Sequence, residues 1–296
     1  MVVVKRVIEL WSSMRTVLLA LVFGVFAAVV AAQPSPRWMT LPPTPTLPTP
    51  ERSGHAPVNG IAIWYATFGT NGSPVILLHG RLANANYWGH QVRALAKSHR
   101  VIVMDSRGHG RSTRDSRPYG YALMASDVIG LMDHLGIPQA AVVGWSDGAI
   151  IGLSMTMSHP NRVSRLFAFA ANSDPSGVKD VDKSPVFTAF IARAEKEYEQ
   201  LSATPTQYKE FLAQISNMWA TQPNWTAADL NAIKVRTWIV DADHDEAIHR
   251  ANTEFMARAI PNAGLLLQPE VSHLSFLQAP EQFTQHVELF LARKWD

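Results

Sequence analysis

The feature that most constrains this chain is a strand, a sharp turn and a helix within residues 142–151, VVGWSDGAII. A β-rich run leads into Gly-Trp-Ser-Asp-Gly, and an apolar segment with helical character follows at once. Such a turn places Ser146 at its apex in strained backbone geometry, and Gly144 and Gly148 leave room where the strand and helix backbones pack closely. The pattern is that of a nucleophile elbow, although Gly-x-Ser-x-Gly alone also fits an ordinary glycine-rich turn.

Length and composition bound the class of protein. With 296 residues, 47% of them apolar and 17% charged, the chain can bury a large core and fits one sizeable domain with an insertion. The formal net charge is +2, and the first 32 residues carry all of this excess. The neutral remainder predicts no nucleic-acid partner. The sequence contains no cysteine, which excludes disulfides, thiolate metal sites and a cysteine nucleophile.

The N-terminus has the pattern of an export signal. Arg15 precedes an uncharged, mostly apolar run over residues 17–32, and small residues before Gln33 occupy the two positions that signal peptidase reads. We predict a signal peptide over residues 1–32, cleavage after Ala32, and a periplasmic or extracellular mature protein. The alternative is an uncleaved membrane anchor, for which this run is short. Only in that case do we expect contact with a membrane.

Residues 33–57 are rich in proline, QPSPRWMTLPPTPTLPTPERSGHAP, and show no hydrophobic periodicity. Such a segment has little to bury and favours extended conformations. We predict a linker here, either a semi-rigid tether or a disordered leader.

Short apolar runs alternate with helical patterns from residue 58 onward. The predicted strands are residues 61–68, 75–78, 101–104, 140–143, 166–170, 237–240 and 265–267. Two apolar stripes with helical spacing predict helices, one through Val128, Leu131, Met132 and Leu135 and one through Phe283, Val287, Phe290 and Leu291. Strands separated by helices imply βαβ units and a mostly parallel sheet covered by helices on both faces.

One interval interrupts this alternation. Residues 172–232 contain no convincing strand, and segments such as 184–201 and 205–218 are rich in the helix formers Ala, Glu, Lys and Gln. We predict an inserted helical cap, which divides the core into residues 58–171 and 233–296. Most cap aromatics are expected to pack between cap and core, and a minority to line a substrate pocket.

Four local signatures occur in the order found in the α/β-hydrolase superfamily, which this chain resembles from about residue 58 to residue 293. They are Leu78-His79-Gly80, the segment 105–112 (DSRGHGRS), the turn 144–148 and Val271-Ser272-His273. The resemblance implies the α/β-hydrolase fold with an inserted helical cap. Gly-Trp-Ser-Asp-Gly is similar to the elbow of capped serine esterases, including enzymes like valacyclovir hydrolase.

The chemistry of Ser146 requires two partners. A serine hydroxyl is a poor nucleophile at neutral pH, so it needs an imidazole to take its proton and a carboxylate to orient that imidazole. The superfamily has the chain order serine, acid, histidine, and beyond residue 250 the chain has only His273 and His286. His286 lies within a predicted amphipathic helix and His273 on a loop, which favours His273 as the general acid/base.

The acid lies in the run 241–246, DADHDE, after a predicted strand. The superfamily pattern at this point is glycine, acid, any residue, acid, and Asp243 and Asp245 fit its acid positions. The second acid resembles the triad member, which favours Asp245 over Asp243. For Asp243 and Asp241, turn formation and helix capping are the plainer roles.

Attack by Ser146 creates an oxyanion, which needs preorganised amide donors. The resemblance assigns these to the backbone N–H groups of Asp147, after the nucleophile, and Arg81, in the loop after His79. The Arg81 side chain is expected in solvent, with contact to an acidic substrate group as the alternative. His79 is expected to shape the loop and not to act as a base.

These predictions combine into a secreted, capped α/β-hydrolase with Ser146 as nucleophile, His273 as general acid/base and Asp245 as its orienting partner. The expected reaction is hydrolysis of a small-molecule carboxylic ester through an acyl-enzyme, with no cofactor and no metal ion. The same triad can hydrolyse amides, lactones or carbon-carbon bonds, so these reactions stay open. A non-catalytic binding or sensor protein on this fold is the alternative from another class.

Overall fold

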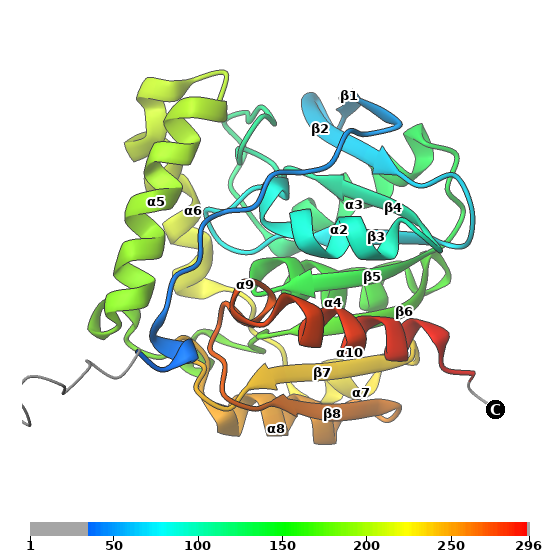
Figure 1. Cartoon of the computed structure of the whole chain (residues 1–296), viewed down its shortest axis with the longest axis vertical. Coiled ribbons are helices and arrows are strands. Elements are labelled where there is room, and N and C mark those ends of the chain that lie inside the picture. The colour runs from blue at the N-terminus through cyan, green and yellow to red at the C-terminus, as the bar shows by residue number, and fades with distance from the viewer. Residues whose placement is uncertain (1–34, 295–296) are drawn as a thin grey trace, which may run out of the picture. The chain divides into compact units, whose positions relative to one another are not determined.

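The central layer of this computed structural model, which describes residues 35–294, is an eight-stranded sheet (Figure 1). The strand order is β1-β2-β4-β3-β5-β6-β7-β8. The strands are β1 (Arg52–Val58), β2 (Ile61–Phe68), β3 (Pro74–Leu78), β4 (Arg100–Met104), β5 (Ala140–Trp145), β6 (Val163–Phe169), β7 (Thr237–Ala242) and β8 (Ala263–Gln268). Every strand predicted from residue 61 onward is present.

Only β2 breaks the parallel order of the sheet. It pairs antiparallel with β1 and β4, whereas the pairings from β4–β3 through β7–β8 are parallel. This confirms the predicted mostly parallel sheet. The linker predicted over residues 33–57 is wrong for residues 52–57, which belong to β1. The strand lies at the sheet edge, where Pro57 is tolerated and most of its residues are not buried, so its sequence lacks a strand pattern.

Helices cover both faces of the sheet, as predicted. Alternate residues of β3 point to opposite sides, with Ile76 and Leu78 in one apolar cluster and Val75 and Leu77 in the other. The first cluster includes residues of α3 (Tyr121–His134), α4 (Asp147–Ser158) and α8 (Arg250–Ala259). The second includes residues of α2 (Gly89–Leu95), α9 (Ser275–Gln278) and α10 (Pro280–Ala292).

The chain between β6 and β7 forms the inserted helices that the sequence predicts. These are α5 (Pro185–Leu201), α6 (Tyr208–Thr221) and α7 (Ala227–Asn231). At the start of α5, the Ser184 side chain accepts a hydrogen bond from the N–H of Phe187, and Pro185 occupies the first turn. Figure 1 shows α5 and α6 beyond the carboxyl ends of the parallel strands.

Residues 37–51, which we call the strap, are ordered against the fold (blue in Figure 1). The carbonyl of Pro42 accepts a hydrogen bond of 2.6 Å from Arg193 on α5, and that of Thr40 accepts one of 2.9 Å from Gln278 on α9. The strap is therefore bound to the rest of the fold, and the alternative of a disordered leader is wrong for these residues. Prolines lack N–H groups, and in these two contacts the strap supplies the carbonyls and distant side chains supply the donors.

The predicted signal peptide over residues 1–32 lies outside the described residues. Within residues 35–294, no helix is both long enough and apolar enough to cross a membrane. Cleavage after Ala32 and export stay predictions.

Candidate active site

Ser146 joins β5 to α4 at the carboxyl edge of the sheet. Its φ of 54° and ψ of −121° are unfavourable for a residue with a side chain, which confirms the predicted strained turn. A Cβ at Gly144 would lie 2.4 Å from the carbonyl oxygen of Gly148, and one at Gly148 would lie 2.1 Å from that of Leu78. Both positions therefore need glycine. The N–H of Ser146 donates to the carbonyl of Phe169 at 2.8 Å and secures the turn.

His273 and Asp245 form a buried hydrogen-bonded pair. The Nδ1 of His273 lies 2.8 Å from Oδ2 of Asp245, and each side chain is 2% exposed. Oδ1 of Asp245 accepts the backbone N–H groups of Ala247 and Ile248 at 2.7 and 2.8 Å. Burial acts to raise the pKa of Asp245, but the facing His273 lowers it overall. Burial acts to lower the pKa of His273, but the Asp245 carboxylate raises it overall.

A second carboxylate, that of Glu246, holds the loop that carries His273. Its Oε2 accepts the backbone N–H of His273 at 3.0 Å, and its Oε1 accepts the hydroxyl of Ser272 at 3.3 Å. Gln278 accepts the N–H of Ser272 at 2.8 Å and donates to the strap at Thr40. The acid loop, the histidine loop and the strap are thus linked by hydrogen bonds.

Two other carboxylates of the run 241–246 have structural partners. Asp243 accepts two backbone N–H groups of the loop after β8, at 3.0 and 3.4 Å, which is the predicted turn role. Asp241 is fully buried and accepts the hydroxyl of Thr253 on α8 at 2.6 Å, so its predicted capping role is wrong. Burial, and then the charge of Asp245, raise the pKa of Asp241 well above its ordinary range.

The two other histidines weighed from the sequence have structural roles. His286 lies on α10, and its Nδ1 is 2.8 Å from the side-chain amide of Gln268. The histidine that is hydrogen-bonded to Asp245 is His273. His79 donates from Nδ1 to the carbonyl of Gly80 at 2.8 Å and accepts the N–H of Ser106 at Nε2 at 2.9 Å. Burial lowers the pKa of His79 to about 4, so its ring is neutral at physiological pH. Its predicted loop-shaping role is confirmed.

Arg81 and Asp147, the predicted oxyanion donors, are both next to the elbow in the chain or in space. A Cβ at Gly80 would lie 2.9 Å from the Cβ of Ser146, so the backbone leading into Arg81 lies against the serine. The N–H of Asp147 is at the first position of α4, where N–H groups have no partner within the helix. Among the hydrogen bonds within residues 35–294, none comes from the Arg81 N–H or the Ser146 hydroxyl.

The side chains of Arg81 and Asp147 both meet Trp219 on cap helix α6. The indole N–H of Trp219 donates to Oδ2 of Asp147 at 2.8 Å, and the hydroxyl of Tyr121 donates to Oδ1 at 2.8 Å. The guanidinium carbon of Arg81 lies 3.9 Å from the centre of the Trp219 ring. The Arg81 side chain is therefore stacked and half-buried, where the sequence predicts solvent. No pattern in the sequence distinguishes Trp219 from the other cap aromatics.

Other cap aromatics pack on the same region from α5. The ring of Phe187 lies 5.7 Å from that of His273, and the ring of Phe190 lies 5.7 Å from that of Trp145. Phe187 and Phe190 are buried, which agrees with the predicted packing role.

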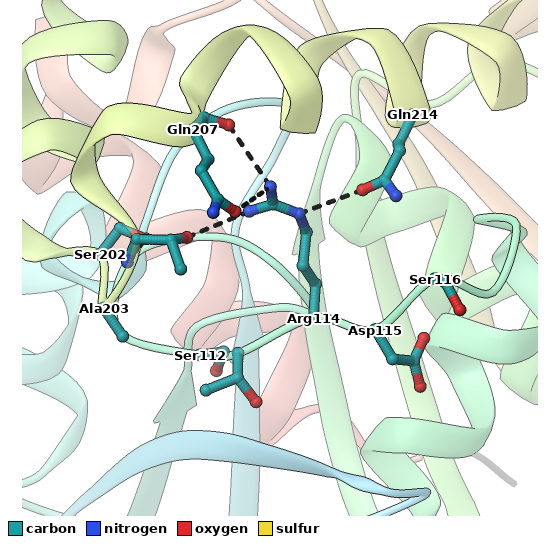
Figure 2. Close-up of a pocket in the computed structure, with 10 residues that line it drawn as sticks. Ser112, Arg114, Asp115, Ser116, Ser202, Ala203, Gln207 and Gln214 are labelled. Carbon is teal, nitrogen blue, oxygen red and sulfur yellow. Dashed lines mark hydrogen bonds between the residues drawn. The ribbon is translucent and has the colours of Figure 1, made fainter.

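A separate contact between core and cap is made by Arg114, in the loop after β4 (Figure 2). Its guanidinium donates to Gln214 on α6 at 3.1 Å, to Tyr198 on α5 at 2.7 Å and to Thr204 at 3.2 Å. Arg114 lines a polar cavity of about 290 Å³ to which no candidate triad residue contributes. Because these acceptors are neutral and belong to the cap, we interpret Arg114 as a clamp between core and cap.

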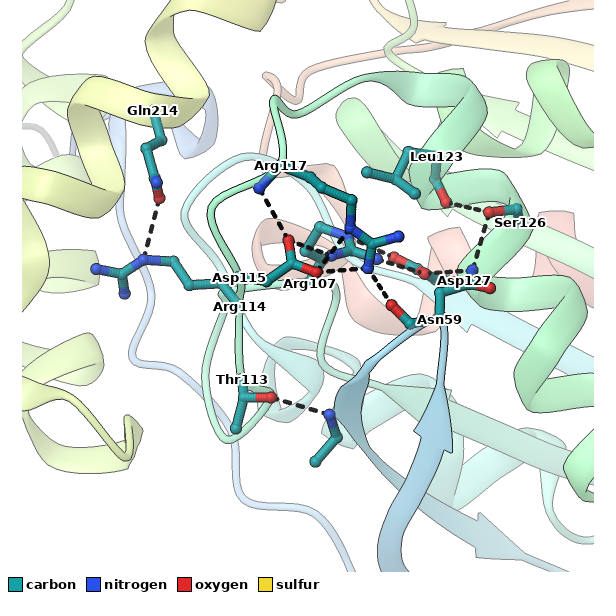
Figure 3. A network of polar contacts seen from close by, with 11 residues as sticks. Asn59, Arg107, Thr113, Arg114, Asp115, Arg117, Leu123, Ser126, Asp127 and Gln214 are labelled. Carbon is teal, nitrogen blue, oxygen red and sulfur yellow. Dashed lines mark hydrogen bonds and ion pairs between the residues drawn. The ribbon is translucent and has the colours of Figure 1, made fainter.

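The loop that carries Arg114 is itself anchored in the core (Figure 3). Arg107 donates to both carboxylate oxygens of Asp127 on α3 at 2.9 and 2.8 Å, with both side chains 1% exposed. Arg107 also reaches Asp115 at 3.2 Å, and Asn59 donates to Asp127 at 2.8 Å. This bidentate, buried pair gives the Arg114 clamp a rigid base.

Within residues 35–294, no group of three or more His, Asp or Glu side chains is placed to hold a metal ion. In the acidic run, His244 stacks on Trp38 of the strap with ring centres 3.9 Å apart, and Asp245 is bound to His273.

Comparisons with known proteins agree with this geometry. The family described as alpha/beta hydrolase fold matches residues 73–191. The chain is 26% identical over 262 residues to the serine hydrolase BPHL of Mus musculus, across 84% of this chain and 89% of the relative. It is 27% identical over 254 residues to 3-oxoadipate enol-lactonase 2 of Acinetobacter baylyi, across 79% and 94%. The chain therefore has the α/β-hydrolase fold.

A solved structure supports the same fold for this hydrolase. The enol-lactonase from Burkholderia xenovorans LB400 has a TM-score of 0.65 and 24% identity, and the match covers 81% of this chain and all of that one. The family match over residues 73–191 includes the elbow at Ser146 and ends before Asp245 and His273. The case for these two residues in this hydrolase therefore depends on their contacts.

Proposed function

We propose that this α/β-hydrolase is a serine hydrolase that cleaves a small-molecule carboxylic ester through an acyl-enzyme. Ser146 is the nucleophile, His273 the general acid/base and Asp245 its orienting partner. The observation that carries the proposal is the buried 2.8 Å hydrogen bond between His273 Nδ1 and Asp245, which leaves Nε2 for the serine. The similarity to a serine hydrolase of Mus musculus adds support.

Acylation begins when Oγ of Ser146 attacks the carbonyl carbon and its proton passes to Nε2 of His273. The tetrahedral intermediate then collapses, the bond to the alcohol oxygen breaks, and the imidazolium of His273 gives its proton to the leaving alkoxide. Asp245 stabilises the imidazolium and takes no proton. The products of this half-reaction are a free alcohol and an ester of Ser146.

Deacylation repeats these steps with water. His273 takes a proton from water as the oxygen attacks the acyl carbon, and the proton then returns to Oγ of Ser146 as the carboxylic acid leaves. In both half-reactions the oxyanion receives hydrogen bonds from the N–H groups of Arg81 and Asp147. One such donor is typically worth about 10²–10³ in kcat. Hydrogen bonds to the serine often form fully only with substrate bound, which accounts for the unpaired Ser146 hydroxyl.

A panel of p-nitrophenyl esters of increasing acyl length tests the reaction class, with a matching p-nitroanilide as the amide counterpart. We expect turnover of at least one ester, preference for the ester over the anilide, and loss of turnover in His273→Ala. His286→Ala is the matched control and should keep wild-type rates. Folded protein that turns over no ester would contradict the proposal and favour a binding role.

A lactone is the second candidate substrate class, because two of the matched proteins are named as enol-lactonases. A lactone is a cyclic ester, so the same attack by Ser146 opens the ring and the alcohol stays attached to the acyl group. A γ-lactone in the same panel distinguishes the classes by the ratio of kcat/KM values.

We also propose that the protein is exported after cleavage behind Ala32. The apolar run over residues 17–32 and the small residues before Gln33 support this. N-terminal sequencing of the protein from the cell fraction in which it accumulates should begin at Gln33. An intact N-terminus in the membrane fraction would contradict export and indicate an anchor.

A further inference from the structure

The residues proposed to supply oxyanion donors are held partly from outside the core. Their two side chains, those of Asp147 and Arg81, meet on one indole ring, that of Trp219 on cap helix α6. By contrast, the Asp245 carboxylate is bound by core residues, among them the N–H groups of Ala247 and Ile248 and the ring of His273. Trp219 is therefore a point at which the cap can act on the elbow.

Asp147 is fixed between the core and the cap. The side chain is 4% exposed, and its two oxygens accept from Tyr121 on α3 and from Trp219 on α6, each at 2.8 Å. Burial, and then the Asp147 charge, raise the pKa of Tyr121 well above its ordinary range, so its hydroxyl stays a donor. With a donor on each side, the carboxylate of Asp147 has little freedom, and the orientation of its backbone N–H is restricted with it.

Arg81 is held by the face of the same ring. The 3.9 Å separation is within the range of a cation–π contact, which is worth about 0.5–2 kcal/mol depending on solvent exposure. Gly80 lies directly against Ser146, so the backbone that leads into Arg81 passes beside the elbow. The stacked guanidinium therefore restrains the remaining freedom of the Arg81 peptide.

We infer that Trp219 is a positioning residue for the oxyanion hole, in which one cap side chain orients both residues that supply the backbone donors. The inference rests on the proposed function. When the cap holds the indole in place, the two N–H groups are aligned before substrate binds, so the benefit appears in the transition state. Trp219 acts through Asp147 and Arg81 and need not touch the reacting atoms.

The cap has a second attachment that is independent of Trp219. Arg114 bonds to α5, α6 and the turn between them, and Arg107 anchors its loop to the core. Removal of the indole N–H should therefore leave the cap docked. A loss of activity in a Trp219 variant can then be attributed to the position of the oxyanion donors and not to undocking of the cap.

Trp219→Phe is the central variant, because phenylalanine keeps an aromatic face for Arg81 and loses the hydrogen bond to Asp147. We expect kcat on the best ester of the panel to fall about tenfold, with KM within about twofold, since one charge-assisted hydrogen bond is lost. Trp225→Phe, at another half-buried cap tryptophan, is the matched control and should keep both constants. Thermal unfolding should show both variants folded.

A phenylboronic acid reports on the oxyanion hole without turnover, because its adduct with serine is tetrahedral and negatively charged. Its inhibition constant should rise in Trp219→Phe by about the same factor as kcat falls. Asp147→Asn can accept only one of the two donors, so it should cause a similar loss. In the double variant the losses should not multiply, because both act on one contact.

The outcomes separate this inference from the proposed function. An unchanged kcat in Trp219→Phe, or a loss confined to KM, would overturn the positioning role, the second result indicating direct contact with substrate. Multiplying losses in the double variant would also overturn it. A folded wild-type protein that neither turns over an ester nor binds the boronic acid would overturn the proposed function, and the inference with it.

Discussion

The two sides of the candidate site are held by different kinds of contact. On the histidine side, the carboxylates of Asp245 and Glu246 bind the ring and the backbone of His273 by hydrogen bonds within core loops, and the cap adds the apolar contact of Phe187. On the elbow side, Asp147 and Arg81 depend in part on one cap residue, Trp219. The difference indicates that the acid/base pair is built into the core, whereas the proposed oxyanion donors are completed by the cap.

This difference has an energetic reason. A buried carboxylate beside an imidazole must be paired and hydrogen-bonded to offset its desolvation. Its partners therefore need fixed positions, which the core loops provide. Backbone N–H groups carry no charge and need only to point toward the oxyanion. A neighbouring side chain from a separate element can fix that orientation. Variants on the two sides should therefore differ in kind, with chemistry lost on the histidine side and alignment lost on the cap side.

The largest effect is expected from Asp245→Asn on the histidine side. Loss of the charge and of the correct ring orientation should lower kcat by about 10³–10⁴. The wild-type pKa of His273 is raised, and the base must be neutral, so activity falls as pH drops through that raised value. Without the carboxylate, burial lowers the pKa of His273, and the acid limb of kcat/KM should move to lower pH.

A pH–rate profile from about pH 5 to 9 checks this shift. An acid limb at the same pH in Asp245→Asn and the wild type would show that another group sets it. That result would remove the distinction between the two sides.

An intermediate effect is expected from Arg114→Ala on the cap side. The variant loses its bonds to α5 and α6, which should lower the free energy of unfolding by about 1–3 kcal/mol and raise KM more than it lowers kcat. Arg114→Lys is the matched control, because lysine keeps the positive charge but lacks the planar guanidinium. Its stability and KM should lie between those of the wild type and of Arg114→Ala. Urea unfolding and ester kinetics measure both quantities. Unchanged stability in Arg114→Ala would show that the cap is held elsewhere.

The smallest effect is expected from Asp241→Asn. Burial and the Asp245 charge raise the pKa of Asp241, so the protonated acid is favoured, and an amide has nearly its shape and charge. We expect kcat within about threefold of wild type, although Asp241 lies near the end of β7 and Asp245 lies in the loop that follows it. A loss as large as that in Asp245→Asn would assign Asp241 to the catalytic machinery.

The pH dependence of the unfolding free energy should also show that Asp241 is protonated in the folded state. A carboxyl with a raised pKa binds its proton more tightly in the folded state, so its contribution to stability falls as pH rises above the ordinary Asp pKa. Asp241→Asn removes this contribution. The difference in unfolding free energy between wild type and variant should therefore move in favour of the variant as pH rises, measured by urea unfolding at several pH values.

Local patterns were sufficient to predict much of the fold. The buried parallel strands are short apolar runs, and the elbow is specified by Gly144, Ser146 and Gly148, whose spacing matches a strained turn. The hydrogen bond between His273 and Asp245 agrees with the pairing predicted from chain order. These features depend on residues close together in sequence, or on residues that follow neighbouring strands of the sheet. Patterns in the sequence are therefore enough to predict them.

Features that depend on distant partners were missed. β1 carries a glycine and a proline at an exposed edge, and the strap is ordered by donors such as Arg193 and Gln278 from far along the chain. The sequence around Asp241 suggests a turn residue, whereas in the structure its side chain is buried beside Thr253 and Asp245. Trp219 has the same local sequence character as other cap aromatics, and only tertiary packing brings it to the elbow.

The central claim is that Ser146 is an activated nucleophile, and covalent labelling tests it most directly. Protein beginning at Gln33 is treated with a fluorophosphonate and its intact mass is compared with that of Ser146→Ala treated in the same way. The account predicts a single adduct on the wild type and none on the variant. No adduct on folded wild-type protein, or an equal adduct on Ser146→Ala, would contradict it.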